Sequence, residues 1–258
     1  PLKIKIDKAF MELIGLYLAE GCTTKHETKW SFGWHEHNTL ADHCVDLIRQ
    51  VFCIEATKKL NTETTIISIN SKHIARFFRM LFYDGKGHKV RNKRIPLWIM
   101  KLPQNKVRYL LRGLWLGDGH MSKKTFTIGS VNETMLRQAK ALFSKCSVYT
   151  NIYLTKPTYR NQTHQLIVAS KFLADCEYVF GIKHPRLNKI QRYRVADCAL
   201  DRGGYFSLPI EKIIKNEYNG KVYDISVPDT HSFVAGGAVV SNSPMESIVE
   251  WLTFLIQA

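Results

Sequence analysis

The chain contains two closely matching nine-residue segments, LIGLYLAEG at residues 13–21 and LRGLWLGDG at residues 111–119. Each segment carries one acid, Glu20 or Asp118, directly before its final glycine. Each also has two small residues four positions apart, which fall on one face of a helix and let a second helix approach closely. The repeat therefore predicts two helices packed against each other, with their two acids side by side at the helix ends.

Further landmarks repeat at nearly constant spacing, 98 residues from Glu20 to Asp118 and 96 from Lys93 to Lys189, which indicates a duplicated unit. Each half is predicted to run helix, two strands, helix, two strands, helix. Helices are expected at residues 8–19, 39–52 and 133–143, capped by Asp7, Asn38 and Asn132. Strands are expected at residues 62–70, 148–156 and 162–169, with one buried and one wet face.

The charge balance is strongly basic, with 37 Lys and Arg against 22 Asp and Glu, a formal net charge of +15 and a pI near 9.6. Such an excess favours a polyanionic partner, DNA or RNA. An anionic membrane surface is the alternative, but the sequence has no apolar run of membrane-spanning length. The six cysteines show no zinc-like spacing, so we expect a reduced, intracellular protein without structural zinc.

Two acids at the ends of paired helices sit in an unfavourable place, because helix C-termini carry partial negative charge and the carboxylates repel each other. A divalent cation removes that cost, and hard oxygen ligands suit Mg²⁺. Metals flanking a phosphodiester activate water and stabilise the leaving oxyanion. The alternative is a pair of solvated acids with no ligand.

The wet faces of the predicted sheets carry basic and aromatic residues that fit a nucleic-acid groove. The alternative is a merely solvated surface. The candidates for DNA contact are Lys25, Lys29, Trp30, Trp34, Lys58 and Lys59 in the first half, and Lys123, Lys124, Lys156, Tyr159 and Arg160 in the second.

The two nonapeptides resemble the paired LAGLIDADG motifs of homing endonucleases, in the two-motif monomeric form, over about residues 7–200. The resemblance implies an α+β fold of two αββαββα halves related by a pseudo-two-fold axis, with saddle-shaped antiparallel sheets that grip DNA. It implies that Glu20 and Asp118, with the adjacent Ala19 and Gly117, bind two or three Mg²⁺ ions, for which Mn²⁺ or Ca²⁺ can substitute in binding. The block NKRIP at residues 92–96 resembles the one that carries a water-positioning lysine, which implies catalytic roles for Lys93 and, by the repeat, Lys189.

Residues 222–243 resemble the C-terminal splicing blocks of inteins. The resemblance assigns Asn242 as the residue that cyclises, Ser243 as the following nucleophile, and Asp224 and His231 as residues that assist proton transfer. Ser241 stands where inteins usually have His, and no N-terminal splicing block precedes the first helix. We therefore expect a passive β-appendage, part of an intein Hint domain, which would need a separate N-terminal intein fragment to splice.

Four segments are predicted: a first half at 1–104, a second at 105–203, a splicing-like segment at 204–242 and a host-protein-like helical tail at 243–258. The predicted function is Mg²⁺-dependent, site-specific cleavage of double-stranded DNA by a monomer of intein origin, at a long pseudo-symmetric site and leaving short 3′ overhangs. The alternatives are an RNA maturase or inactive DNA-binding module on the same fold, and a protein-splicing element whose nuclease is incidental.

Overall fold

The computed structural model describes residues 3–83, 85, 87, 89–155 and 163–185, and in the C-terminal region 200–202, 206–208, 210, 212–221, 223, 225–235 and 238–241. The chain divides into two compact units, residues 1–207 and 208–258. None of the helices in the described residues combines the length and the apolar composition that a membrane span requires.

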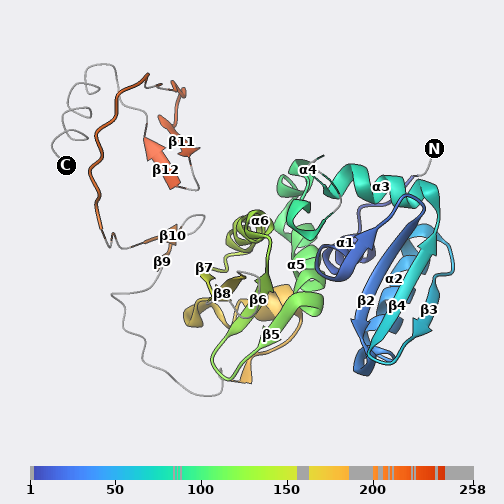
Figure 1. Cartoon of the computed structure of the whole chain (residues 1–258). Coiled ribbons are helices and arrows are strands. Elements are labelled where there is room, and N and C mark those ends of the chain that lie inside the picture. Colours follow the sequence, from blue (N-terminus) through green and yellow to red (C-terminus); the bar gives the residue numbers. More distant parts are fainter. Residues whose placement is uncertain are drawn as a thin grey trace. The chain divides into compact units, whose positions relative to one another are not determined.

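The first half of the larger unit has the predicted order of elements (Figure 1). It runs α1 (Lys8–Glu20), β1 (Gly21–Thr23), β2 (Glu27–Gly33), α2 (Leu40–Phe52), β3 (Thr57–Leu60), β4 (Thr64–Asn70) and α3 (Lys72–Phe82). The four strands form one antiparallel sheet in the order β1-β2-β4-β3. The short helices η1 (Trp34–Glu36), η2 (Val90–Asn92) and α4 (Leu97–Met100) lie in the connections.

The second half repeats this arrangement with α5 (Gln104–Asp118), β5 (Gly119–Met121), β6 (Phe126–Ser130), α6 (Glu133–Lys145), β7 (Thr150–Leu154), β8 (His164–Val168), η3 (Ser170–Phe172) and α7 (Cys176–Phe180). Its sheet has the equivalent strand order, β5-β6-β8-β7. The predicted α+β architecture of two αββαββα halves is confirmed, and both sheets are antiparallel.

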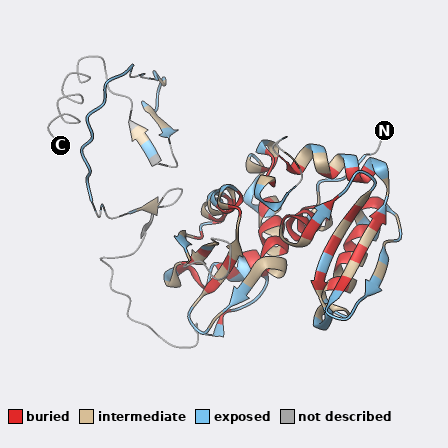
Figure 2. Cartoon of the chain, in the orientation of Figure 1, coloured by how far each residue is buried: buried red, intermediate tan, exposed pale blue. Residues whose placement is uncertain are grey.

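Helices α1 and α5 pack directly against each other at their small residues. A Cβ added to Gly15 would lie 2.1 Å from the carbonyl oxygen of Leu110, and one added to Gly113 would lie 2.1 Å from that of Glu12. Only glycine fits at these two positions, because the backbones themselves are in contact. Nine residues of α1 are buried, as expected for a helix enclosed by its own sheet on one side and α5 on the other (Figure 2).

A buried ion-pair group also joins the halves. Glu12 of α1 is fully buried, and its Oε1 lies 2.8 Å from Nε2 of His43 on α2 and 3.4 Å from Nε of Arg112 on α5. A buried carboxylate requires such partners, because burying an unpaired charge is costly. The sequence alone did not indicate this contact.

The predicted helix starts are right at two of three places. Asp7 and Asn132 accept hydrogen bonds from the backbone N–H groups of Phe10 and Met135, which makes them the N-caps of α1 and α6. The prediction of Asn38 as the cap of α2 is wrong, since α2 begins after Thr39. The chain makes a 3₁₀ turn at η1 before α2, and this shifts the start of the helix by one residue.

The C-terminal region contains short antiparallel pairs. Strands β9 (Leu200–Asp201) and β10 (Phe206–Ser207) pair within the larger unit, where the Phe206 ring packs on Tyr149 and Phe172. Strands β11 (Ser232–Ala235) and β12 (Ala238–Ser241) form a hairpin within residues 208–258. The helix predicted at 243–258 lies outside the described residues.

Candidate metal and DNA-binding site

The two acids of the repeat end their helices in the same way. Helix α1 ends at Glu20 and α5 at Asp118, and the glycine that follows each donates its N–H to the carbonyl four residues back, on Tyr17 or Trp115. Both glycines have extended backbones, so left-handed geometry does not explain them. A Cβ on Gly21 would lie 2.2 Å from the Tyr17 ring, and one on Gly119 would lie 2.3 Å from the Trp115 ring. The terminal glycine of each motif thus makes room for the ring and the backbone carbonyl of the aromatic residue four positions earlier.

The two carboxyl groups lie close enough to affect each other, in a poorly solvated place. Burial raises the pKa of Glu20 to about 7, and the carboxylates of Asp118 and Glu36 act in the same direction. Burial likewise raises the pKa of Asp118 to about 6, although the Lys93 ammonium opposes it. Without a further cation, this pair holds protons more tightly than ordinary carboxyl groups do.

The charge of Lys93 acts on both carboxyl groups, and this residue is almost completely buried, with 4% of its surface exposed. Its Nζ donates hydrogen bonds of 3.0 Å to the backbone carbonyls of Tyr17 and Leu18, in the last turn of α1, and lies 5.2 Å from the centre of the Tyr17 ring. Burial lowers the pKa of Lys93 to about 8 despite the charges of Asp118 and Glu20. The ammonium therefore caps the helix that carries Glu20.

The segment that carries Lys93 belongs to the first half in sequence but is held by the second half. The Asn132 side chain accepts from the N–H of Met135 and donates through Nδ2 to the carbonyl of Lys93 at 2.7 Å. Gln138, further along α6, exchanges two 2.8 Å hydrogen bonds with the backbone of Ile95. Docking of the second half thus sets where the lysine lies.

A second polar cluster lies beside the C-terminal end of α1. The buried Tyr17 hydroxyl hydrogen-bonds to Oγ1 of Thr23 at 2.6 Å and to the hydroxyl of Tyr83 at 3.0 Å. Tyr83 in turn forms a β-bridge with Lys93. The sequence did not single out these residues, because a Tyr or Thr in an apolar segment is more often an ordinary core residue.

The site suits a divalent cation. Two partly buried carboxyl groups with raised pKa values gain from a nearby dication, which offsets both the burial and the mutual repulsion. Both groups offer the hard oxygen atoms that Mg²⁺ prefers. Among the described residues there is no cluster of three or more His, Cys, Asp or Glu that forms an all-protein cage. A site completed by water and phosphate oxygens is what a two-carboxylate set requires.

The residues proposed for DNA contact in the strands of the first sheet divide between its two faces. Lys29 and Lys59 lie on the face of the first sheet that the helices leave open, and Lys29 is ion-paired with Glu27 at 2.8 Å. Lys25 lies in the turn between β1 and β2, and Lys123 and Lys124 in the equivalent turn between β5 and β6. Trp34, just beyond β2, is 62% exposed.

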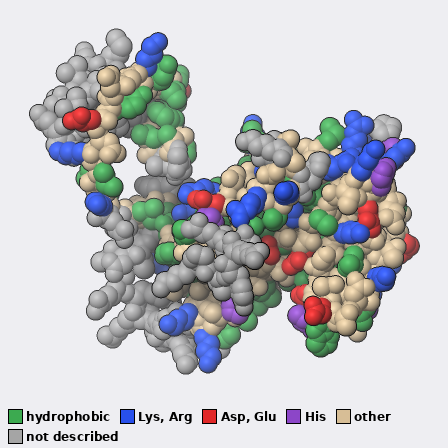
Figure 3. Space-filling model, in the orientation of Figure 1, with side chains coloured by type: hydrophobic (Ala, Val, Ile, Leu, Met, Phe, Trp, Pro, Cys, Tyr) green, Lys and Arg blue, Asp and Glu red, His purple; other side chains and the backbone are tan. Residues whose placement is uncertain are grey.

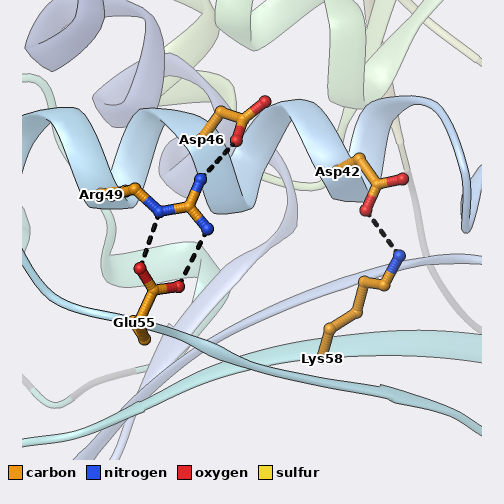
Figure 4. Close-up of polar contacts among 5 residues, drawn as sticks. All are labelled: Asp42, Asp46, Arg49, Glu55 and Lys58. Atoms are coloured by element: carbon orange, nitrogen blue, oxygen red, sulfur yellow. Dashed lines mark hydrogen bonds and ion pairs between the residues drawn. The ribbon is translucent and has the colours of Figure 1, made fainter.

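Two of these assignments are wrong. Trp30 is fully buried and packs edge-on against the rings of Tyr17 and Phe78, since its neighbours in β2 face outward. Lys58 pairs in register with the buried Ile67 and so points to the helix-covered face. Figure 4 shows Lys58 reaching Asp42 on α2, beside a second group in which Arg49 bridges Asp46 and Glu55.

Several proposed residues lie outside the described residues: Lys189, Lys156, Tyr159, Arg160, Asp224, Asn242 and Ser243. His231 is described and exposed, with a left-handed backbone at φ 47°. The predicted DNA-contact residues did not include any on α3, which carries Lys72, Arg76 and Arg79 and over which basic side chains gather in Figure 3.

Comparison with known proteins finds a family model that matches part of the chain. A model of the LAGLIDADG-like domain matches residues 105–179. Curated relatives include the uncharacterized protein MJ0043 of Methanocaldococcus jannaschii, 25% identical and covering 94% of this chain. The replication factor C small subunit of the same organism is 24% identical over 91% of the chain, and a DNA polymerase of Thermococcus hydrothermalis is 27% identical over 69%. The chain spans 31%, 16% and 11% of their respective lengths.

Solved structures share the fold at low sequence identity. Mesophilic variants of the homing endonuclease I-DmoI give a TM-score of 0.53 at 13% identity, covering 69% of this chain and 97% of that one. I-DmoI in complex with DNA and Ca gives 0.52 at 13% identity, covering 68% and 90%.

Proposed function

The chain carries a LAGLIDADG-like domain and has the fold of a LAGLIDADG homing endonuclease, and we propose that it is a metal-dependent endonuclease that cuts double-stranded DNA at a specific site. The observation that carries the proposal is the pair of partly buried carboxyl groups, Glu20 and Asp118, at the ends of two close-packed helices. A protein that only bound DNA would gain nothing from this pair, which is costly to bury and would repel phosphates.

In this proposal Glu20 and Asp118, with the backbone oxygens of Ala19 and Gly117, hold the divalent ions. The bound Mg²⁺ supplies Lewis-acid stabilisation and lowers the pKa of attacking water. Structures of I-DmoI with its DNA and Mn, Mg or Ca support the choice of metal class. Lys93 keeps the end of α1 in place and brings a positive charge close to the reacting phosphate, with Lys189 as its proposed counterpart.

We further propose that the target is long and roughly two-fold symmetric, because the two halves repeat the same sheet on either side of the α1–α5 pair. Each half would cut one strand and leave short 3′ overhangs, and one chain would suffice for both cuts. The net charge of +15 supplies the salt-dependent attraction to phosphates that such a long site requires.

An intein origin is part of the proposal. Relatives named as a replication factor C subunit, a DNA polymerase and a transcription initiation factor IIB match most of this chain but only 11–32% of their own lengths. A shared segment inside proteins of unrelated names is what an inserted element predicts. The splicing-like residues Asp224, His231, Asn242 and Ser243 agree with that origin.

The test is selection of cleaved molecules from a DNA library with randomised target sites. We expect the wild-type protein to select one long site with Mg²⁺ and to bind without cutting when Ca²⁺ replaces it. Site-specific binding without cutting in Mg²⁺ or Mn²⁺ would instead support an inactive DNA-binding module. Loss of the segment after Asn242, detected by mass, would show that splicing chemistry is active.

A further inference from the structure

The open faces of the two sheets differ in charge, although the sheets are built alike. Register makes the rows of residues comparable: Ser31, Ile66 and Lys59 lie in a row across the first sheet, and Gly129, Gln165 and Tyr153 lie in the corresponding row across the second. The next row of the first sheet contains Lys29, and that of the second contains Asn151.

Strands β5–β8 contain no Lys, Arg, Asp or Glu, whereas β1–β4 contain Glu27, Lys29, Lys58 and Lys59. Beside the strands of the second sheet, the β5–β6 turn carries Lys123 and Lys124. The two sheets therefore offer different chemistry to a DNA groove, lysine ammonium groups on one side and neutral amides on the other.

Gly129 is the least expected residue of the second open face. It lies in β6, which has a strand on each side, and its φ is outside the left-handed range. A Cβ added there would meet no atom within 4 Å. Glycine weakens a strand by about 0.5–1 kcal/mol relative to alanine, and neither backbone geometry nor packing in the described structure requires it here. A strand glycine of this kind marks a place where another molecule comes close.

Two amide side chains, those of Gln165 and Asn151, lie on the same open face as Gly129. Gln165 pairs directly with Gly129 in register and is exposed. Asn151 pairs with Ile167 and lies on the same open face. In the part of the chain that the structure describes, neither side chain forms an internal hydrogen bond. Asn and Gln amides form two hydrogen bonds with adenine in the major groove, whereas Lys favours guanine.

Building on the proposed endonuclease function, we propose that the two sheets read unlike half-sites. Gln165 and Asn151 recognise adenine in A·T pairs of the half-site under the second sheet, and Gly129 leaves the space in which the base edges approach. The first sheet reads its half-site through Lys29 and Lys59, with a preference for G·C pairs. The target is thus symmetric in outline but not in base composition.

The experiment selects bound DNA from a randomised library in Ca²⁺, with wild-type protein and three variants. Wild type is expected to select A·T pairs on the side of the second sheet. Gln165→Ala should lose about tenfold discrimination at a position on that side only, and Lys59→Ala at a position on the other side only. Gly129→Val should fold at least as stably as wild type, because the added side chain meets open space, yet bind the selected site more weakly.

The outcomes separate this inference from the function on which it rests. If wild type binds no specific site, the endonuclease proposal itself fails. If it selects a site but Gln165→Ala relaxes no position, or G·C pairs are selected under the second sheet, the unlike half-sites are refuted. Unchanged affinity in a folded Gly129→Val protein would refute the space assigned to Gly129.

Discussion

Substitution of Gly113 by alanine tests the helix pair on which the whole site rests. The added Cβ would lie 2.1 Å from the carbonyl oxygen of Glu12 and 2.9 Å from the backbone nitrogen of Leu16. Both atoms belong to helix backbone, so no side-chain rotation relieves the clash and the two helices must separate. Overpacking a core by one carbon costs about 1–3 kcal/mol, and a backbone clash belongs at or above the upper end.

Alanine also favours the helical state over glycine by about 1 kcal/mol, which opposes this loss. We expect a net loss of about 2 kcal/mol in the free energy of unfolding, and a fall in Tm of about 4–8 °C for a domain of this size. Thermal and urea unfolding followed by circular dichroism measure both.

The matched control is Gly129→Ala, which adds the same atom to a strand position with no neighbour within 4 Å. It should raise stability by up to about 1 kcal/mol. A Gly113→Ala protein as stable as wild type would refute the close packing of α1 on α5.

Two further predictions concern the site itself. Asn132→Asp keeps the acceptor for the Met135 N–H but loses the donor to the Lys93 carbonyl. The rate of DNA cleavage should therefore fall about tenfold, while the helical circular dichroism signal persists. An unchanged rate would mean that the hydrogen bond from Asn132 does not position Lys93. The folded-state pKa values of Glu20 and Asp118, about 7 and 6, exceed those of the unfolded chain, so the folded protein binds more protons and metal-free stability should fall as pH rises from about 5 to 7.5. Urea midpoints should show this slope in wild type and a flatter one in the Glu20→Gln, Asp118→Asn double variant; equal slopes would contradict the assignment.

Local pattern was enough to predict the architecture. The spacing of small residues in the two nonapeptides predicts a close helix pair, because the contact depends on residues four apart in one helix. Burial of Gly15 and Gly113 against facing backbone bears this out. The duplicated order of elements followed from strand alternation and capping residues, both of which act over a few neighbours.

The site was only partly predictable, because some of its parts come from distant segments. Nothing local shows that Asn132 holds the segment carrying Lys93, since its capping role already accounts for it. Trp30 and Lys58 were misplaced because they were grouped with their neighbours Lys29 and Lys59, although adjacent residues of a strand point to opposite faces of the sheet.

The central claim is that Glu20 and Asp118 hold the metals that cut DNA. Its most direct test is the rate of Mg²⁺-dependent cleavage of the selected site by wild type, Glu20→Gln and Asp118→Asn, with Glu63→Gln as a control for an acid outside the site. Binding of the same DNA in Ca²⁺, measured in parallel, shows whether each variant is still folded and able to recognise its target. The account predicts that both site variants bind the DNA but lose double-strand cleavage by at least a hundredfold, on the order of 2.7 kcal/mol in barrier height, while the control cuts normally. Equal cleavage by all four proteins would contradict it.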